Sequence, residues 1–388
     1  MSPKSEAGFS PRLMFIAGEN SGDMHAAHLI RELRTLIPDV ECFGFGGERM
    51  EAAGMRLDEN LAQKLPIIGF TQALRNYGKL KSLLERAQQM LAKEKPDAVV
   101  LVDYPGFNLR TARAAKALGI PVIYYISPQI WAWNHKRIHT IAETVTRMLV
   151  ILPFEEEIYR KAGVPAVYVG HPLNDSPPPQ ISREEILAEV GIAQGKTVIG
   201  LMPGSRVPEI VRHLPMMLET AELICKKMPG VEFLLPRAST IAGSSIKKYL
   251  GRHPGIPVHV TETDSKAAMR AMDFAICKSG TSTLELALAG VPMVIVYKVS
   301  TITYLLAKAL IRIRWIGLVN IVANEEVAPE LLQNDATPEK VAKKVMRIMN
   351  DPTRLASMRG KLDHVRELVG GSGASRRAAE EIAAVLRK

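Results

Sequence analysis

The sequence predicts an α/β protein built from two doubly wound, largely parallel sheets. Short apolar runs typical of buried strands alternate with helical stretches along most of the chain. Residues 175–179, Asp-Ser-Pro-Pro-Pro, interrupt this alternation near the middle, because successive prolines continue neither a helix nor a strand. The alternation then starts again. A chain of 388 residues is also long enough for two domains of about 150 residues each.

The individual elements follow from this pattern. Strands are expected at residues 13–17, 42–45, 98–102, 122–126, 148–152, 167–169, 198–202, 232–235, 258–260, 274–277 and 293–297. Helices are expected at residues 25–36, 80–95, 109–118 and 214–228. The tail after Asp351 reads as helical, with a glycine-rich break at 370–373 before an amphipathic helix over 374–386. We expect domains over 1–172 and 173–388, with a cleft between them as the natural ligand site.

Composition narrows the class of protein. Hydrophobic residues make up 47% of the chain, and the formal net charge is +10. A basic surface suits nucleic acid, anionic lipid or phosphorylated substrates, and solvated surface charge is the simpler alternative. Cys42, Cys225 and Cys277 have neither zinc-ligand spacing nor a disulfide framework, which fits a reducing compartment. No signal-peptide pattern and no apolar run near 20 residues appear, so a cytoplasmic protein is expected.

The most informative local signal is Ser279-Gly280-Thr281, with Glu285 one turn later. This string joins an expected strand to an expected helix, and the unpaired N–H groups of a helix start attract phosphate. Glu285 could accept hydrogen bonds from sugar hydroxyls. Phosphate donors beside a hydroxyl acceptor suggest a nucleotide diphosphate, with an ordinary capped helix as the alternative.

A second loop, Pro203-Gly204-Ser205-Arg206, ends the first strand of the second domain. Gly204 frees the backbone, and Arg206 offers a planar fork that matches a diphosphate. Both loops follow strands of one sheet, so they can converge at its carboxyl edge. Their convergence favours the nucleotide interpretation.

Two loops of the first domain carry further polar groups. Ser21, Gly22 and Asp23 follow the first strand, where small residues allow a ligand to approach the backbone; the string is not a dinucleotide GxGxxG fingerprint. Asp103 falls where a strand ends, and a carboxylate there could deprotonate a hydroxyl nucleophile if a partly dry site raised its pKa. Helix capping is the alternative role for Asp23 and for Asp103.

A third loop of this domain is aromatic and basic. Such a loop suits a phosphorylated or amphipathic ligand, and core packing of the tryptophans is the alternative. Segments 66–70 and 304–323 have a similar interfacial character, although a buried helix and strand would explain 304–323 equally well. The candidate ligand contacts of the third loop are Gln129, Trp131, Trp133, Lys136 and Arg137.

Taken together, these loops resemble the lipid A disaccharide synthases, a family of bacterial glycosyltransferases. The matching strings run in family order from residue 17 to about 333, and Asn20 and Asn324 stand where the family often has Ala and Gly. The strings are AGENSGDMHAAHL, FGFGGERMEAAGM, VDYPGFN, YYISPQIWAW, LPFEEEIYRKAGVPAVYVGHPL, LMPGSR, KSGTSTLELALAGVPMVIVYK and LVNIVANEEVAPELLQ.

The resemblance implies a GT-B architecture of two Rossmann-like domains facing an interdomain cleft. It implies UDP-2,3-diacylglucosamine as donor and 2,3-diacylglucosamine 1-phosphate (lipid X) as acceptor, with a β-1,6-linked disaccharide 1-phosphate and UDP as products. Stereochemistry would invert, with neither metal nor cofactor. The enzyme would be peripheral on the cytoplasmic face of the inner membrane. Family members can form dimers, and the C-terminal helices would pack back on the first domain or be exchanged in a dimer.

The resemblance also implies residue roles, which fit the chemistry of each group. Asp103 would be the base for the acceptor hydroxyl. Residues 204–206 and 279–281 would bind and stabilise the departing UDP, with Arg206 as its main cation. Glu285 would bind the ribose, and Asn320 would lie near the donor. The first domain would bind acceptor and lipid, and the second the UDP-sugar.

Two other functions are weighed against this one. The first is another UDP-amino-sugar GT-B enzyme, either an N-acetylglucosaminyltransferase or a 2-epimerase. The second is a non-enzymatic basic protein that binds nucleic acid with strong salt dependence. The polar loops at strand ends disfavour the second, so no nucleic-acid partner is expected.

Overall fold

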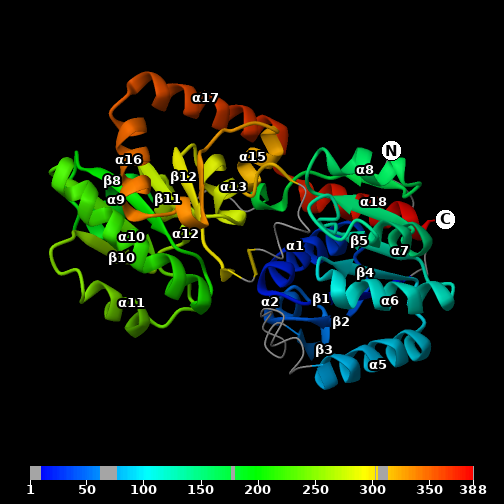
Figure 1. The fold of residues 1–388 in the computed structure, drawn as a ribbon. Helices are drawn as coiled ribbons and strands as arrows, with labels where there is room; N and C mark the ends of the chain where they lie inside the picture. The colour runs from blue at the N-terminus through cyan, green and yellow to red at the C-terminus, as the bar shows by residue number, and fades with distance from the viewer. Residues whose placement is uncertain (1–9, 62–76, 176–179, 302, 305–312, 388) are drawn as a thin grey trace, which may run out of the picture. The chain divides into compact units, whose positions relative to one another are not determined.

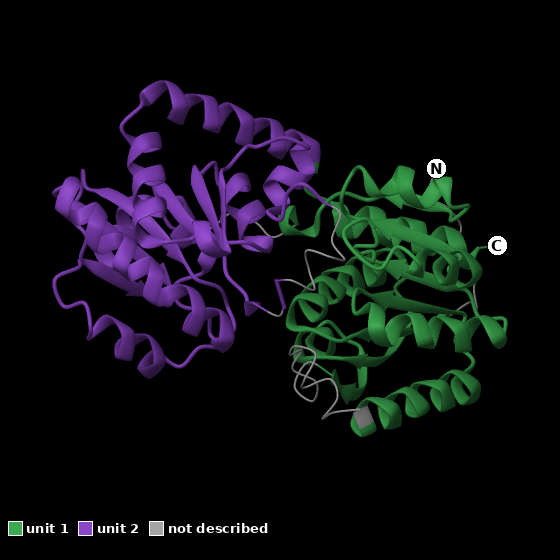
Figure 2. Ribbon diagram, in the orientation of Figure 1, with its two compact units in different colours: residues 1–176, 369–388 green, residues 177–368 purple. Residues whose placement is uncertain are grey.

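A computed structural model describes residues 10–61, 77–175, 180–301, 303–304 and 313–387. The chain forms two compact units (Figure 2). Unit 1 comprises residues 1–176 and 369–388, and unit 2 comprises residues 177–368. The division at 176/177 lies within the proline-rich stretch, four residues beyond the boundary expected from the sequence, and the last twenty residues belong with the first unit.

Unit 1 is a seven-stranded sheet with helices on both faces (Figure 1). Its strand order is β3-β2-β1-β4-β5-β6-β7, and the recorded pairings are parallel. The strands are β1 (Arg12–Ala17), β2 (Glu41–Gly46), β3 (Arg56–Asn60), β4 (Ala98–Val102), β5 (Val122–Tyr125), β6 (Arg147–Val150) and β7 (Ala166–Tyr168). The helices are α1 (Asn20–Leu36), α2 (Glu48–Ala52), α5 (Tyr77–Glu94), α6 (Pro105–Ala117), α7 (Arg137–Thr144), α8 (Glu155–Lys161), the 3-10 turn η1 (Pro172–Asn174) and α18 (Ala374–Leu386).

The core of unit 1 has two layers because strand side chains alternate between the faces of the sheet. One layer joins Met14 and Ile16 of β1 to helices α5, α6 and α7. The other joins Leu13 and Phe15 of the same strand to α1, α2 and α18. Strands buried on both faces read as continuous apolar runs, which is why the sequence revealed them.

Unit 2 is a six-stranded sheet of order β10-β9-β8-β11-β12-β13, also with parallel pairings. Its strands are β8 (Thr197–Met202), β9 (Val231–Pro236), β10 (Val258–Thr261), β11 (Phe274–Lys278), β12 (Met293–Tyr297) and β13 (Glu330–Leu332). Its helices are α9 (Arg183–Glu189), α10 (Val207–Lys227), α11 (Gly243–Leu250), α12 (Ser265–Arg270), α13 (Thr281–Leu288), α15 (Leu318–Ala323), the 3-10 turn η2 (Gln333–Asp335), α16 (Pro338–Met349) and α17 (Pro352–Val369).

Both sheets have the strand order of a doubly wound nucleotide-binding fold. In each, the first and fourth strands are neighbours, and the order of succession reverses between them: β1 beside β4, and β8 beside β11. Ligands of such sheets bind outside the carboxyl ends of the strands at this switch point. The loops after these four strands are therefore the places to look for a site.

The C-terminal segment is fastened to unit 1 by polar contacts. The Asp175 carboxylate accepts hydrogen bonds from the backbone N–H groups of Gly373, Ala374 and Ser375, at 2.8, 2.8 and 2.7 Å. Arg377 Nε donates to the Val169 carbonyl at 2.7 Å. Since α18 also packs against α1, these contacts make it an integral helix of unit 1.

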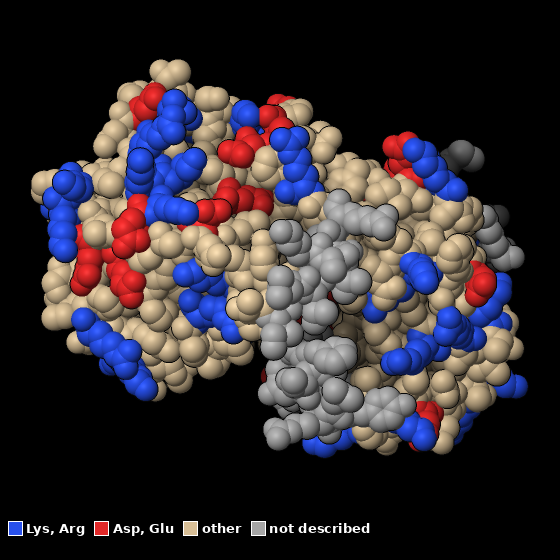
Figure 3. All heavy atoms as spheres, viewed as in Figure 1, with Lys and Arg blue, Asp and Glu red and all other residues tan. Residues whose placement is uncertain are grey.

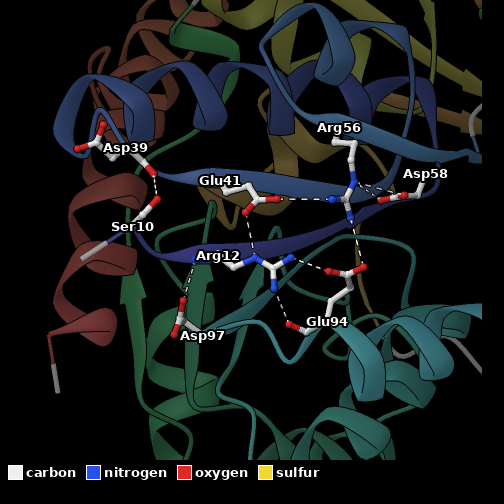
Figure 4. Close-up of polar contacts among 8 residues, drawn as sticks. All are labelled: Ser10, Arg12, Asp39, Glu41, Arg56, Asp58, Glu94 and Asp97. Carbon is white, nitrogen blue, oxygen red and sulfur yellow. Dashed lines mark hydrogen bonds and ion pairs between the residues drawn. The ribbon is translucent and has the colours of Figure 1, made fainter. Parts of the chain in front are cut away.

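A cluster of charged side chains lies at the edge of the unit 1 sheet where the strands begin, opposite the edge where they end (Figure 4). Arg12 is paired with Glu41 at 2.9 Å and with Glu94 at 2.6 Å, and Arg56 reaches the same two carboxylates at 3.5 and 3.8 Å. Both guanidinium groups lie over the Phe43 ring, 5.3 and 4.9 Å from its centroid. This cluster stabilises the edge at which the strands begin, away from the loops that follow them.

The structure confirms the predicted α/β class with two parallel sheets, and every predicted strand is present within one or two residues. Two edge strands were not predicted: β3 is polar, Arg-Leu-Asp-Glu-Asn, and β13 has three residues. Segment 66–70 and most of 304–317 lie outside the described residues, whereas 318–323 forms helix α15. Within the described part of the chain, no helix is long and apolar enough to cross a membrane.

Candidate active site

The turn after β4 holds Asp103 in an unusual backbone conformation. Asp103 and Tyr104 both have φ near +48°, the left-handed region that costs energy for residues with a side chain. Three hydrogen bonds hold this turn: the Asp103 carbonyl accepts from Tyr124 Oη at 2.6 Å and from Asn108 Nδ2 at 2.7 Å, and its N–H donates to the Tyr125 carbonyl at 3.0 Å. Backbone strain maintained by such a framework is typical of functional positions.

The Asp103 carboxyl is tuned toward neutral pH. Burial is the main cause that raises its pKa to about 6, and the charge of the nearby Glu19 carboxylate contributes to the same shift. Glu19 is the residue before α1, in the loop after β1, so the two acids follow neighbouring strands at the switch point. The Tyr104 ring lies directly over Gly18, where a β-carbon would come within 2.4 Å of it. Asp103 therefore has the pKa of an effective general base in a partly enclosed turn.

The residues predicted as a ligand loop after β1 belong instead to a helix. Because α1 begins at Asn20, Ser21, Gly22 and Asp23 form its first turn. Asp23 is buried and accepts hydrogen bonds from the N–H groups of Arg49 at 3.2 Å and Met50 at 3.0 Å, which caps the start of α2. Gly22 is buried, and Ser21 is exposed. The structure thus gives Asp23 a supporting role in the fold.

The aromatic loop contains a buried anchor. Glu155, 1% exposed, accepts hydrogen bonds from Ser127 Oγ at 2.8 Å, Trp131 Nε1 at 3.0 Å and the Leu152 N–H at 3.2 Å. Burial raises the pKa of Glu155 to about 7, although these donors oppose the shift. Trp131 also meets Phe154 edge to face at 5.2 Å. The half-buried Trp131 is therefore held by contacts within unit 1, which favours the packing alternative for this ring over ligand binding.

The second tryptophan of the loop behaves differently. Trp133 is 45% exposed, and the Arg137 guanidinium lies 4.7 Å from its ring centroid. Gln129 and Lys136 are exposed beside it in the sequence, and Arg137 is half-buried. An exposed aromatic–cation pair next to a lysine is the part of this loop that can contact an amphipathic ligand.

In unit 2, residues 203–206 (the PGSR loop) lead from β8 into α10. The N–H groups of Ser205 and Arg206 donate to Glu209 Oε2 at 3.0 and 3.3 Å, and the Ser205 carbonyl accepts from Thr240 Oγ1 at 2.7 Å. Gly204 has φ +118°, and a β-carbon there would meet Glu209 at 2.3 Å. The N–H groups of Ser205 and Arg206 are thus engaged by Glu209, and the exposed Arg206 side chain is the cationic group of the loop.

Residues 279–281 (the SGT turn) join β11 to α13. Ser279 is buried, and its hydroxyl donates to the Ile316 carbonyl at 2.8 Å. Thr281 is the exposed first residue of α13. Because β8 and β11 are paired, with Cys277 opposite Met202, the SGT turn and the PGSR loop lie side by side as predicted. Thr281 and the N–H groups in the first turn of α13 are therefore the candidate anion-binding groups. Ser279 instead holds the turn in place through its bond to Ile316.

Two further predicted donor residues differ in what they can offer. Glu285 is half-buried one turn into α13, and burial raises its pKa, with Asp264 adding to the effect and Lys266 opposing it. Asn320 is fully buried: its Nδ2 donates to the Ala328 carbonyl and Glu330, and its Oδ1 accepts from the N–H groups of Val327 and Ala328. Since all its hydrogen-bonding groups are engaged, Asn320 shapes the loop before β13.

An ion pair that was not predicted from the sequence joins the two loops. Lys278 Nζ, at the end of β11, lies 2.8 Å from Glu209 Oε1, and both side chains are 18% exposed. The signal for Glu209 was present, because an acid three residues after a helix cap is the pattern of a capping box. The signal for Lys278 was only its position before the SGT turn.

Two further kinds of site, for a metal ion and for nucleic acid, can be compared with the described residues. Among the described residues, no three His, Cys, Asp or Glu side chains gather as a metal site would require. On the face drawn in Figure 3, Lys and Arg are spread over both units and intermixed with Asp and Glu. That face shows no continuous basic field of the kind that tracks a nucleic-acid backbone.

Comparisons with known proteins agree with the fold and with the family resemblance of the sequence. A family model described as lipid-A-disaccharide synthetase matches residues 13–384. The lipid-A-disaccharide synthase of Geobacter metallireducens is 42% identical over 377 residues, covering 97% of this chain and 98% of that protein. A kitacinnamycin glycotransferase structure matches with a TM-score of 0.65 at 16% identity, covering 98% of this chain and 100% of that chain.

A second solved structure extends the fold comparison. The UDP-GlcNAc 2-epimerase from Neisseria meningitidis, solved bound to UDP-GlcNAc, has a TM-score of 0.65 at 12% identity and covers 97% of this chain and 100% of that chain. At such low identities the structural similarity establishes only a shared GT-B-like fold. The family model and the relative from Geobacter metallireducens establish the family. The chain belongs to the lipid-A-disaccharide synthase family.

Proposed function

We propose that this protein transfers diacylglucosamine from UDP-2,3-diacylglucosamine to 2,3-diacylglucosamine 1-phosphate, forming the β-1,6 lipid A disaccharide 1-phosphate and UDP. The observation that carries the proposal is that the switch point of each sheet holds one of the two groups that the reaction needs. The switch point of unit 1 presents a carboxyl with a pKa of about 6, and the switch point of unit 2 presents an arginine beside a helix start. Glycosyl transfer from a nucleotide sugar needs one of each.

Unit 2 would bind the donor. The Arg206 guanidinium would pair with the diphosphate, and Thr281 with the first N–H groups of α13 would hydrogen-bond its oxygens. Glu285 would accept hydrogen bonds from the ribose hydroxyls. Gly204, Ser205, Ser279 and Gly280 would act by shaping the loops, since the Ser205 N–H and the Ser279 hydroxyl already donate to Glu209 and to the Ile316 carbonyl.

Unit 1 would bind the acceptor and activate it. Asp103 would take the proton of the acceptor 6-hydroxyl as that oxygen attacks the anomeric carbon of the donor sugar. The bond from this carbon to the diphosphate breaks on the opposite side, UDP leaves with the electron pair, and the configuration inverts. The growing negative charge on UDP would be stabilised by Arg206 and the start of α13. This scheme uses only residues of this chain.

The substrates are lipids, so we propose peripheral attachment to the cytoplasmic face of the inner membrane. The net charge of +10 and the exposed Trp133–Arg137 pair with Lys136 support it, because each cation near an anionic surface contributes about 1 kcal/mol.

Family resemblance also supports a homodimer, which light scattering of the purified chain would distinguish from a monomer.

The test compares acylated and unacylated donors. With the acylated donor and acceptor, we expect UDP release that depends on the acceptor. With UDP-N-acetylglucosamine alone, we expect neither epimerisation nor hydrolysis. Turnover of the unacylated donor to a 2-epimer or a free sugar would instead establish the epimerase-type activity.

A further inference from the structure

The carboxylate of Glu209 connects the two loops of the proposed donor site. Its Oε2 accepts the N–H groups of Ser205 and Arg206, and its Oε1 lies 2.8 Å from the Lys278 ammonium. Glu209 comes from the first turn of α10, and Lys278 ends β11. One carboxylate therefore fixes the backbone of the PGSR loop and the residue that precedes the SGT turn.

The glycines of both loops make room for this pair. A β-carbon at Gly204 would lie 2.3 Å from Glu209 Oε2, and one at Gly280 would lie 3.3 Å from Lys278 Nζ. The Gly204 substitution would thus displace the carboxylate, and the Gly280 substitution would crowd the ammonium. Because Gly204 and Gly280 have no side chains, the Glu209–Lys278 pair can lie directly against the backbone of the two loops.

The surroundings favour the ionised form of Glu209. Burial opposes ionisation of Glu209, but Lys278, the Ser205 N–H and Arg206 keep its pKa below the ordinary value. The Lys278 ammonium also faces the Tyr297 ring at 5.8 Å. Behind Glu209, its carbonyl oxygen lies 2.9 Å from His213 Nδ1, and His213 Nε2 accepts from the Lys298 N–H at 3.1 Å. His213 Nδ1 must therefore carry the donated proton, which ties α10 to the end of β12.

We propose that Glu209 and Lys278 are positioning residues of the donor site, and that their mutual neutralisation sets the electrostatic potential felt by the nucleotide diphosphate. The inference rests on the proposed function. Glu209 holds the PGSR loop so that Arg206 starts α10 next to the SGT turn. Lys278 cancels the charge that Glu209 would otherwise present to an anionic ligand.

This arrangement predicts effects of opposite sign, which a merely structural ion pair would not produce. In Lys278→Met, the Glu209 charge is uncompensated and repels the diphosphate, so UDP should bind at least about 10-fold more weakly, the effect of a like charge at low effective dielectric. In Glu209→Gln, the amide oxygen can still accept hydrogen bonds from the loop N–H groups. The positive charge of Lys278 is then no longer neutralised by a carboxylate. UDP should then bind as tightly as to the wild type or more tightly.

The experiment is calorimetric titration of UDP into the full chain at one fixed salt concentration. The variants are Glu209→Gln, Lys278→Met, their double combination and Lys278→Arg, each first checked by thermal melting. The matched control is Lys196→Met, which removes a lysine 3.8 Å from Glu232 at the amino ends of β8 and β9. We expect the double variant and Lys278→Arg to bind UDP within about threefold of the wild type, because each avoids an unpaired carboxylate, and the control to be unchanged.

The outcomes separate this inference from the proposed function. If the wild type binds UDP but Glu209→Gln and Lys278→Met weaken it alike, with additive losses in the double variant, the inference is overturned. If Lys196→Met weakens UDP binding as much as Lys278→Met, the electrostatic argument is also overturned. If the wild type does not bind UDP at all, the proposed function itself is wrong.

Discussion

Glu19 and Asp103 follow neighbouring parallel strands, β1 and β4, and the charge of Glu19 adds to burial in raising the pKa of Asp103 to about 6. The two acids thus lie in neighbouring loops at one switch point of the sheet. A carboxyl with this pKa is ionised at neutral pH yet more basic than an ordinary aspartate, which suits proton abstraction from a sugar hydroxyl.

The Glu19–Asp103 relationship predicts the pH dependence of turnover. The base must be deprotonated, so kcat/KM should fall as pH decreases through about 6. In Glu19→Gln the like charge is gone, and the acidic limb should move to lower pH. Profiles of kcat/KM between pH 4.5 and 8 measure the acidic limb of the wild type and of Glu19→Gln. The same midpoint in the two proteins would contradict the coupling between Glu19 and Asp103.

Replacement of the base should separate catalysis from binding. In Asp103→Asn the turn keeps its backbone hydrogen bonds, but the proton acceptor is lost, and turnover should fall by about 100-fold or more, the usual contribution of general base catalysis. UDP affinity, measured by titration, should not change. Near-normal turnover would remove Asp103 from the mechanism.

Arg206 should contribute to both binding and rate. Arg206→Ala should weaken UDP binding and lower kcat, because the guanidinium would contact the diphosphate before and during its departure. Arg206→Lys should recover only part of the loss, since an ammonium lacks the planar fork. An unchanged UDP titration for Arg206→Ala would exclude the diphosphate assignment.

Much of the fold could be predicted from the sequence because doubly buried strands are continuous apolar runs. β4, Ala-Val-Val-Leu-Val, was predicted to the residue. The edge strand β3 was not, since its polar residues carry no such pattern.

The site was predictable only in part because capping partners come from distant segments. Nothing near Asp23 in the sequence indicates that it accepts hydrogen bonds from Arg49 and Met50. Ser279 likewise looked like a phosphate ligand until its bond to Ile316 was visible. The position of Asp103 could be predicted because it directly follows the apolar strand β4, and that of Arg206 because it ends the short loop after the apolar strand β8.

The buried Glu155 predicts a change of stability with pH. Its pKa is raised from 4.5 to about 7 in the folded protein, so the stabilisation it provides is complete below pH 4.5 and is lost as pH rises through 7. Relative to Glu155→Gln, the wild type should lose free energy of unfolding on the order of 3 kcal/mol between these limits. Urea unfolding at pH 5 and pH 8 measures the difference, and a constant difference would contradict it.

Asp175 should be important for the attachment of the C-terminal helix. Asp175→Ala leaves three N–H groups at the start of α18 without their acceptor, and the free energy of unfolding should fall by about 2 to 4 kcal/mol. Asp335→Ala, which removes an exposed partner of Lys340, is the matched control and should cost less than about 1 kcal/mol. Equal losses in the two variants, measured by chemical denaturation, would contradict the anchoring role.

The most direct test of the central claim is to measure UDP and lipid disaccharide together. Purified wild type and Asp103→Asn would be incubated in detergent micelles with UDP-2,3-diacylglucosamine and 2,3-diacylglucosamine 1-phosphate. We predict equal amounts of UDP and β-1,6-linked disaccharide from the wild type, and a rate of formation of both that is lower by about 100-fold or more in Asp103→Asn. UDP release without disaccharide, or no product from wild type that binds UDP, would contradict the proposed function.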